Sequence, residues 1–134
     1  MGLFDIFNKK KVELDEEQLK WNKMWELWTE KKVKSPYSEL MTYQSEINSG
    51  GHGQYFSNTE NISDLQKEMA GLEKILTSVL KDNLQNAYKA YLAIGKADVD
   101  EKSEEILEQC DDIFYENEEQ INCLLKEFAN TLEI

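Results

Sequence analysis

The chain has 134 residues, with 27 Asp or Glu against 15 Lys and no Arg, so its formal net charge is -12. This length suits one domain with a single core, and a hydrophobic content of 40% is ordinary for a globular protein. The shortage of positive charge argues against direct binding to DNA, RNA or anionic lipid, which depends on Lys and Arg, and it favours a basic protein partner.

Few residues in the sequence could build a catalytic or metal site. His52 is the single histidine and lies among glycines without a Gly-x-Ser-x-Gly motif, and Cys110 and Cys123 form no Cys-x-x-Cys pair. We therefore expect no enzymatic activity, no metal and no cofactor. Both cysteines lie among apolar residues, and we interpret them as reduced, packed thiols of a cytoplasmic protein.

The first residues, MGLFDIFNKKK, combine four apolar side chains after the initial Met-Gly with three lysines. Their order is not that of a secretory signal, and no apolar run in the chain reaches the roughly 18 residues that span a bilayer. We expect residues 1–12 to form a flexible head outside a helical domain of residues 13–134. The alternative is a short amphipathic segment that touches a membrane surface.

Helical periodicity begins in residues 15–33, where large apolar residues recur at the spacing of one helix face. These residues are Trp21, Met24, Trp25 and Trp28. We interpret the face as core packing, although three tryptophans could also form a ligand-stacking site. Ser35 and Pro36 then predict the end of this helix and the start of a second one, in which Tyr43 and Ile47 belong to the buried stripe.

A glycine-rich segment, residues 48–58, interrupts the helical pattern. Its glycines predict a sharp turn after the second helix, followed by a short extended piece at residues 54–56. Ser63 and Gln66 then form a capping box, which predicts a third helix with a regular apolar stripe over residues 62–79.

The remaining sequence predicts three more helices. A break at residues 81–83 separates the third helix from a fourth that ends near Gly95, and Asp98 caps a fifth. Asn117 predicts the start of a sixth helix, with acidic residues in its first turn. We therefore predict an all-α fold, a single compact domain of about six amphipathic helices with a glycine-rich turn after the second.

Acidic residues gather near the C-terminal end of the chain. Residues 1–34 have a net charge of +1, whereas residues 98–119 contain eleven acids and one lysine. On a helix most of these acids fall on one face, opposite the apolar residues between Ile106 and Phe114. At about 1.5 Å per residue they give roughly one charge per 3 Å, near the phosphate spacing of about 3.4 Å along one DNA strand. We call the following set, which Asp98 extends, the acidic ridge: Glu101, Glu104, Glu105, Glu108, Asp111, Asp112, Glu116 and Glu119.

Three interpretations of the acidic ridge are open at this point. It can be a solvated face whose like-charge repulsion a packed helix tolerates, or an imitation of a phosphate backbone that docks into the basic groove of a DNA-binding protein. Calcium binding is the third, and the sequence departs from an EF-hand loop at Lys102 and Ser103. The residues alone favour the solvated face.

The glycine-rich segment resembles the signature of a family of small, acidic, all-helical bacterial proteins described as DNA-mimic-protein-like. The likeness covers roughly residues 17–132, and Ser49 is inserted into the family's Asn-Gly-Gly turn. It implies the fold first, and we interpret the matching residues as structural: glycines for the turn, aromatic anchors, and amides that satisfy buried backbone groups. The matching residues are Gly50, Gly51, Gln54, Tyr55, Phe56 and Asn58.

The resemblance also implies double-stranded DNA mimicry, the role for which the family is named. Together with the acidic ridge it leads us to expect a non-enzymatic, cytoplasmic, bacterial protein that binds a basic partner, such as a DNA-binding regulator, and no nucleic acid directly. Two alternatives stay open. One is an immunity or accessory protein that neutralises a basic toxin, and the other is a small-ligand or peptide pocket lined by Tyr55, Phe56 and Trp25.

Overall fold

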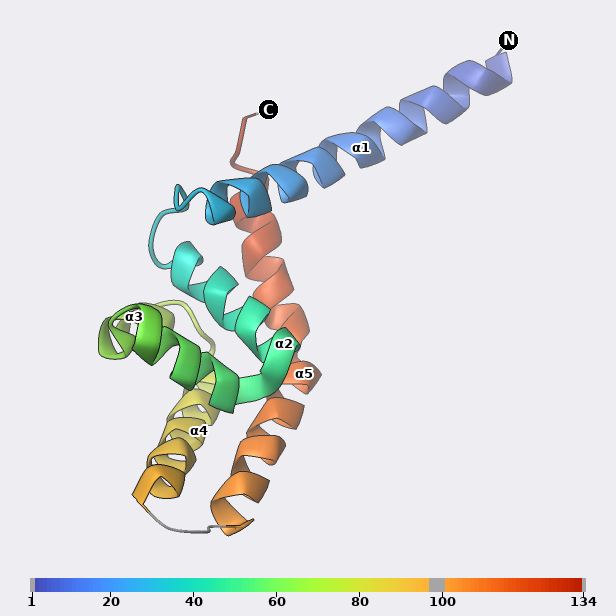
Figure 1. Cartoon of the computed structure of the whole chain (residues 1–134). Helices are drawn as coiled ribbons and strands as arrows, with labels where there is room; N and C mark the ends of the chain where they lie inside the picture. Colours follow the sequence, from blue (N-terminus) through green and yellow to red (C-terminus); the bar gives the residue numbers. More distant parts are fainter. Residues whose placement is uncertain (1, 97–100, 134) are drawn as a thin grey trace.

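The computed structural model describes residues 2–96 and 101–133, and it describes side chains for residues 16–95 and 101–133. Within these ranges the chain forms five α-helices and no strand (Figure 1). The all-α prediction is confirmed, with five helices where about six were expected. The helices are α1 (Gly2–Thr29), α2 (Tyr37–Ile62), α3 (Leu65–Glu73), α4 (Ser78–Lys96) and α5 (Glu101–Ala129).

The C-terminal helix α5 is the central element of the packing. It contacts α1, α2 and α4, and α2 also contacts α3 and α4. The N-terminal half of α1 extends away from the other helices (Figure 1). The core between the helices is formed by large side chains that are fully buried. They are Tyr43, Tyr55, Phe56, Phe114, Met24, Leu40, Met41, Ile47, Leu72, Leu80, Leu84 and Ile121.

The apolar face predicted for the first helix packs on the core. Met24 is buried, and Trp21, Trp25 and Trp28 are partly buried against the core. The indole N–H of Trp28 donates to Thr42 Oγ1 at 3.0 Å, which connects α1 to α2. The tryptophans therefore join the first helix to the rest of the fold, as the core-packing interpretation expected.

The first helix differs from its prediction at both ends. It begins at Gly2, so its backbone includes most of the residues predicted as a head, and the domain boundary at residue 12 stays a prediction. It ends at Thr29 instead of residue 33, and Lys31 adopts a left-handed φ of 61°. Since a left-handed residue cannot continue a right-handed helix, the chain turns there before α2.

A kink at Gly50 and Gly51 divides α2. Gly51 has a φ of 81°, a conformation that favours glycine, and a Cβ atom on this residue would collide with the carboxylate of Asp111. The helix resumes immediately and continues to Ile62, so the extended piece predicted at residues 54–56 is wrong. The glycines change the direction of the chain, and the residues on both sides of them are helical.

The third predicted helix, over residues 62–79, is two helices in the structure. Asp64 caps α3 by accepting from the Lys67 backbone N–H at 3.3 Å, so the predicted capping box at Ser63 and Gln66 is wrong. Residues 74–77 connect α3 to α4. Leu72 in α3 and Leu76 within this connection are buried, whereas Ile62 and Val79 are exposed. The apolar residues therefore keep a helical spacing in the sequence, although the chain leaves one helix and enters another between residues 73 and 78.

The breaks predicted at residues 81–83 and at Asn117 are also wrong, because α4 and α5 run through them. Asn83 is buried, and its side-chain amide donates to the Cys110 carbonyl at 2.8 Å. The Asn117 side chain donates to the Ile113 carbonyl at 2.8 Å within α5. Each polar side chain therefore finds a partner without ending its helix. Asp98, the predicted cap, lies outside the described residues.

The two cysteines differ in their surroundings. Cys110 is buried and Cys123 is exposed, and both are free thiols. The prediction of a packed thiol is confirmed for Cys110 and wrong for Cys123. None of the described helices is long and apolar enough to cross a membrane.

Candidate functional site

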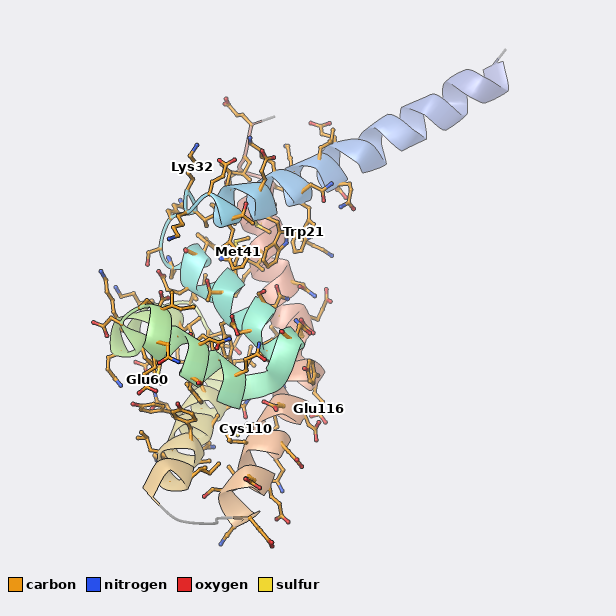
Figure 2. The ribbon with its side chains drawn as sticks, viewed as in Figure 1. Trp21, Lys32, Met41, Glu60, Cys110 and Glu116 are labelled. Atoms are coloured by element: carbon orange, nitrogen blue, oxygen red, sulfur yellow. The ribbon has the colours of Figure 1, made fainter. Side chains whose placement is uncertain are left out.

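All eight residues of the acidic ridge lie on α5, and seven of them are exposed. We call these seven the exposed ridge. In Figure 2, Glu116 lies on the outer side of α5 and Cys110 lies toward the other helices. The exposed ridge consists of Glu101, Glu104, Glu105, Glu108, Asp112, Glu116 and Glu119.

The geometry of a helix places the exposed ridge opposite the buried face of α5. At about 100° per residue its seven members fall within an arc of roughly 120°, and buried residues such as Cys110, Phe114 and Ile121 lie on the other side. From Glu101 to Glu119 the helix rises about 27 Å, which gives one carboxylate for about every 4 Å. This spacing is close to the roughly 3.4 Å between phosphates along one strand of B-DNA.

The negative charge of the exposed ridge has no internal compensation in the described part of the chain. The ion pairs there are Lys20–Glu16, Lys32–Glu30 and His52–Asp111, and none includes a member of the exposed ridge. Glu119 accepts only a weak hydrogen bond from the Cys123 thiol at 3.8 Å. These carboxylates are therefore available to an external partner.

Asp111 differs from the rest of the acidic ridge because it faces α2. Its Oδ1 accepts from the His52 backbone N–H at 2.8 Å and lies 2.6 Å from His52 Nδ1. His52 Nε2 lies 2.6 Å from the Tyr43 hydroxyl. A neutral imidazole satisfies both contacts when Nδ1–H donates to Asp111 and Nε2 accepts from Tyr43.

Tyr43 and His52 are closed to solvent, whereas Asp111 is partly exposed. Tyr43 and His52 have exposed fractions of 0%, so a substrate could not reach either ring. Burial raises the pKa of Tyr43 well above its ordinary value, and the proximity of Tyr55, Cys110 and Asp111 raises it further. The contacts among these three residues therefore connect the kink of α2 to α5, and their role is structural.

Glu118 is a second carboxylate of α5 that faces α2. Its Oε2 accepts from Gln44 Nε2 at 3.1 Å and from Asn48 Nδ2 at 2.8 Å. The Tyr115 hydroxyl donates to the Ile47 carbonyl at 2.9 Å in the same interface. We call Asp111 and Glu118 the inner carboxylates. The sequence counted them with the other acids, and the signal that separates them is their position on the flank of the helix, next to the apolar stripe.

The residues of the glycine-rich motif lie on both sides of the kink. Gly51 occupies the left-handed position, and Gly50 packs against the Gln54 side chain. Tyr55 and Phe56 are fully buried in the core, so they do not line an open pocket as the ligand-binding alternative required. The side-chain amides of the motif were expected to form hydrogen bonds with buried backbone groups, but they donate to a carboxylate instead. Gln54 Nε2 and Asn58 Nδ2 donate to Glu46 Oε2 at 3.0 and 2.9 Å.

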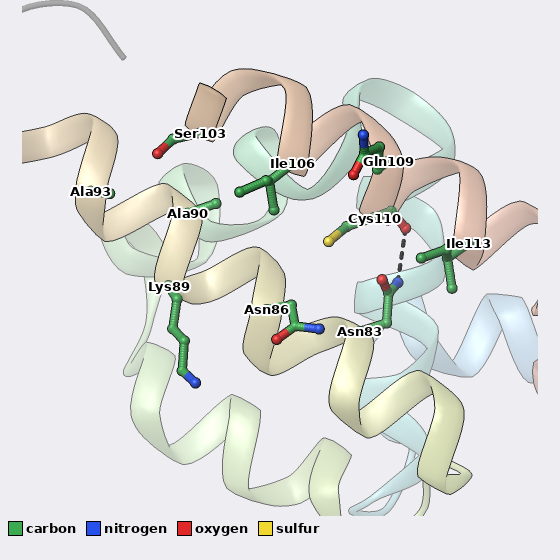
Figure 3. Close-up of a pocket in the computed structure, with 10 residues that line it drawn as sticks. All are labelled: Asn83, Asn86, Lys89, Ala90, Ala93, Ser103, Ile106, Gln109, Cys110 and Ile113. Atoms are coloured by element: carbon green, nitrogen blue, oxygen red, sulfur yellow. Dashed lines mark hydrogen bonds between the residues drawn. The ribbon is translucent and has the colours of Figure 1, made fainter. Parts of the chain in front are cut away.

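A groove between α4 and α5 lies beside the exposed ridge (Figure 3). Its volume is about 460 Å³, and Asn83 lies at its inner end, where the side-chain amide donates to the Cys110 carbonyl. Burial raises the pKa of the Cys110 thiol, which keeps it protonated and poorly nucleophilic. The groove combines amides with apolar side chains. It is lined by Asn83, Asn86, Lys89, Ala90, Ala93, Ser103, Ile106, Gln109, Cys110 and Ile113.

Comparison with known proteins gives one match. A family model described as DMP19-like protein matches residues 36–132, which include α2 to α5 and therefore the kink, the motif and the acidic ridge. No curated protein and no solved structure matches the chain.

Proposed function

Because the chain belongs to the DMP19-like family, a family of DNA-mimic proteins, we propose that it is a non-enzymatic double-stranded DNA mimic. In this proposal the exposed ridge occupies the nucleic-acid site of a basic DNA-binding protein, so that this protein cannot hold DNA at the same time. The partner is a cytoplasmic protein with a groove of Lys and Arg side chains.

The observation that carries the proposal is the row of seven exposed carboxylates along about 27 Å of one helix face. Their spacing is close to that of phosphates, and no lysine of the described chain neutralises them. A groove that binds DNA gains much of its affinity from the release of counterions, and a comparable line of carboxylates can release them as well. Electrostatic complementarity of this kind also accelerates association.

The net charge of the whole chain supports a protein partner over nucleic acid. A net charge of -12 repels a phosphate backbone, so a complex with DNA itself is disfavoured. The same charge steers a basic protein toward the molecule.

Affinity purification from the native cell, followed by DNA competition, tests the proposal. We expect the full chain to recover a basic DNA-binding protein, and a DNA duplex bound by that protein should displace it. Raising the salt concentration from low to moderate should weaken the complex, because each released counterion then gains less entropy. Binding that DNA does not displace would instead indicate another basic partner, such as a toxin, and would contradict mimicry.

Two matched variants locate the surface. The ridge variant changes Glu104, Glu105 and Glu108 to Gln and Asp112 to Asn. The control variant removes the same number of charges from exposed acids elsewhere, by changing Glu17, Glu26 and Glu133 to Gln and Asp82 to Asn. We expect the ridge variant to lose at least about a hundredfold in affinity for the partner, while the control changes less than about tenfold. Equal losses would show that net charge alone drives binding and would contradict a dedicated surface.

A further inference from the structure

A second cavity, of about 650 Å³, lies on another part of the molecule from the exposed ridge. It is formed by the C-terminal end of α1, the two ends of α2 and the N-terminal part of α3, and no residue of α5 lines it. Its size falls within the range of about 300–1,000 Å³ that is common for small-molecule sites. The cavity is lined by Trp28, Thr29, Lys31, Ser38, Thr42, Glu46, Asn58, Thr59, Ile62, Ser63 and Glu68.

The wall of this cavity carries two carboxylates, several hydroxyl groups and one ammonium group, that of Lys31. Glu46 and Glu68 supply two carboxylates, and Thr42 and Thr59 are among the residues that supply hydroxyl groups. Burial raises the pKa of Glu68, and the nearby carboxylate of Glu39 raises it further. A group with several N–H donors and a positive charge would complement such a wall.

A buried hydroxyl group in the wall of the cavity has no hydrogen-bond partner. Thr59 lines the cavity, has an exposed fraction of 5%, and its Oγ1 is unpartnered among the described residues. Buried hydroxyls without partners are uncommon, so this oxygen is available to an N–H donor inside the cavity.

The glycine-rich motif holds one carboxylate of the cavity in place. Gln54 and Asn58 both donate to Oε2 of Glu46, whose Oε1 has no partner among the described residues. Asn58 itself lines the cavity. The half of α2 that follows the kink therefore forms part of the cavity wall, a position that the interpretation of the motif as purely structural did not include.

A metal ion does not fit this site. The described residues contain no group of three or more His, Cys, Asp or Glu side chains arranged to hold one. An ammonium group can instead reach separate oxygen atoms through its N–H donors. Trp28 offers an aromatic surface for such a chain, and the ring also attracts a cation.

From this geometry we propose that the cavity between α1, α2 and α3 binds an alkylammonium group, through Glu46, Glu68 and the hydroxyl of Thr59. The group can belong to a free diamine or polyamine, or to the lysine side chain of a peptide. Lys31 lies at the cavity and forms no ion pair in the structure, so it competes weakly with the ligand. The site does not depend on the proposed DNA mimicry.

Titration of the full chain tests the site by tryptophan fluorescence, because Trp28 lines the cavity, and by calorimetry. The probes are cadaverine, spermidine and Nα-acetyl-lysine amide, with pentanol as the neutral counterpart. We expect saturable binding of an ammonium probe and none of pentanol. Binding of cadaverine or spermidine alone would assign the site to free amines, and binding of the lysine amide as well would assign it to peptide lysines.

Variants separate the cavity from diffuse attraction to the acidic surface. We expect E68Q to reduce affinity at least about tenfold, T59V to reduce it about threefold, and K31A to increase it about twofold. The control is E127Q, which removes the same charge from an exposed residue outside both the cavity and the exposed ridge and should bind the probes as the wild type does. Equal losses in E68Q and E127Q, or no saturable binding of any ammonium probe, would overturn the proposal. The partner pull-down is independent, so failure of one proposal does not imply failure of the other.

Discussion

Asp111 and Asp112 are neighbours in the chain, but their carboxylates lie in different environments. Asp111 accepts from the backbone and the ring of His52, whereas Asp112 is exposed and has no partner among the described residues. Glu118 and Glu119 repeat this difference two turns later, since Glu118 accepts from two amides of α2 and Glu119 from a thiol only. The inner carboxylates connect α5 to α2, whereas none of the ion pairs of the described residues includes a member of the exposed ridge.

The substitution of Asp111 should give the largest difference between the two groups. We expect D111A to destabilise the protein by about 2–4 kcal/mol, because it leaves the buried His52 with unpaired N–H groups. The control D112A should stay within about 0.5 kcal/mol of the wild type. Urea unfolding followed by circular dichroism measures both. Equal stabilities of the two variants would contradict a structural role for Asp111.

A second prediction concerns the kink that Asp111 contacts. G51A places a side chain at a φ of 81° and against the Asp111 carboxylate, and we expect it to cost about 2 kcal/mol. Gly95 lies within α4, with no atom within 4 Å of its virtual Cβ, so G95A should stabilise by up to about 1 kcal/mol. The midpoint temperature of thermal unfolding should therefore fall for G51A and rise for G95A. An unchanged or raised stability of G51A would show that the kink does not need a glycine.

Removal of Glu118 should have a smaller effect than removal of Asp111. Its partners Gln44 and Asn48 are side-chain amides, and Asn48 is exposed, so water can replace part of the interaction. We expect E118A to destabilise by about 1 kcal/mol and E119A by less than about 0.5 kcal/mol. For the partner complex the order should reverse, with E119A weakening it more than E118A. A larger effect of E118A on binding would show that the partner docks on the flank of α5 that faces α2, which would contradict docking on the exposed ridge.

The smallest effect is expected at Glu68, away from α5. Since its pKa is raised in the folded protein, the folded state binds the proton more tightly than the unfolded chain does. Stability from this group is therefore present below its ordinary pKa and falls as the pH rises through that value to the folded pKa. Because Glu68 is partly exposed, the loss should be only roughly a few tenths of a kcal/mol, and E68Q should abolish it. Urea unfolding between pH 4 and pH 7 measures this slope, and an unchanged slope in E68Q would contradict the assignment.

The sequence predicts buried faces well and helix ends poorly. Met24, Tyr43, Ile47 and Phe114 are buried as their helical spacing indicated, because a helix must place its apolar stripe on a core. The sequence predicts a break at Asn83, whereas the residue lies inside α4 and donates to the Cys110 carbonyl on another helix. A local pattern contains no information on such a distant partner.

The same limit applies to the candidate site. The sequence placed the acidic residues on one helix face, yet only packing against α2 separates Asp111 from Asp112. In the same way, the motif indicated Gln54 and Asn58 as structural amides, and only the fold shows that they hold Glu46 at a cavity. Contacts between segments distant in the sequence decide both cases.

The two inner carboxylates have a consequence for how α5 can move. They are seven residues apart, so they lie about two turns from each other on one flank and connect to α2 on either side of its kink. A rotation of α5 about its own axis by one residue would break both connections and would expose Phe114 to water. The rotation of α5 about its axis is thereby fixed, and the seven exposed carboxylates face the same side of the molecule before any partner binds. A partner that binds them then loses little affinity to the ordering of the backbone, because that ordering has already taken place during folding.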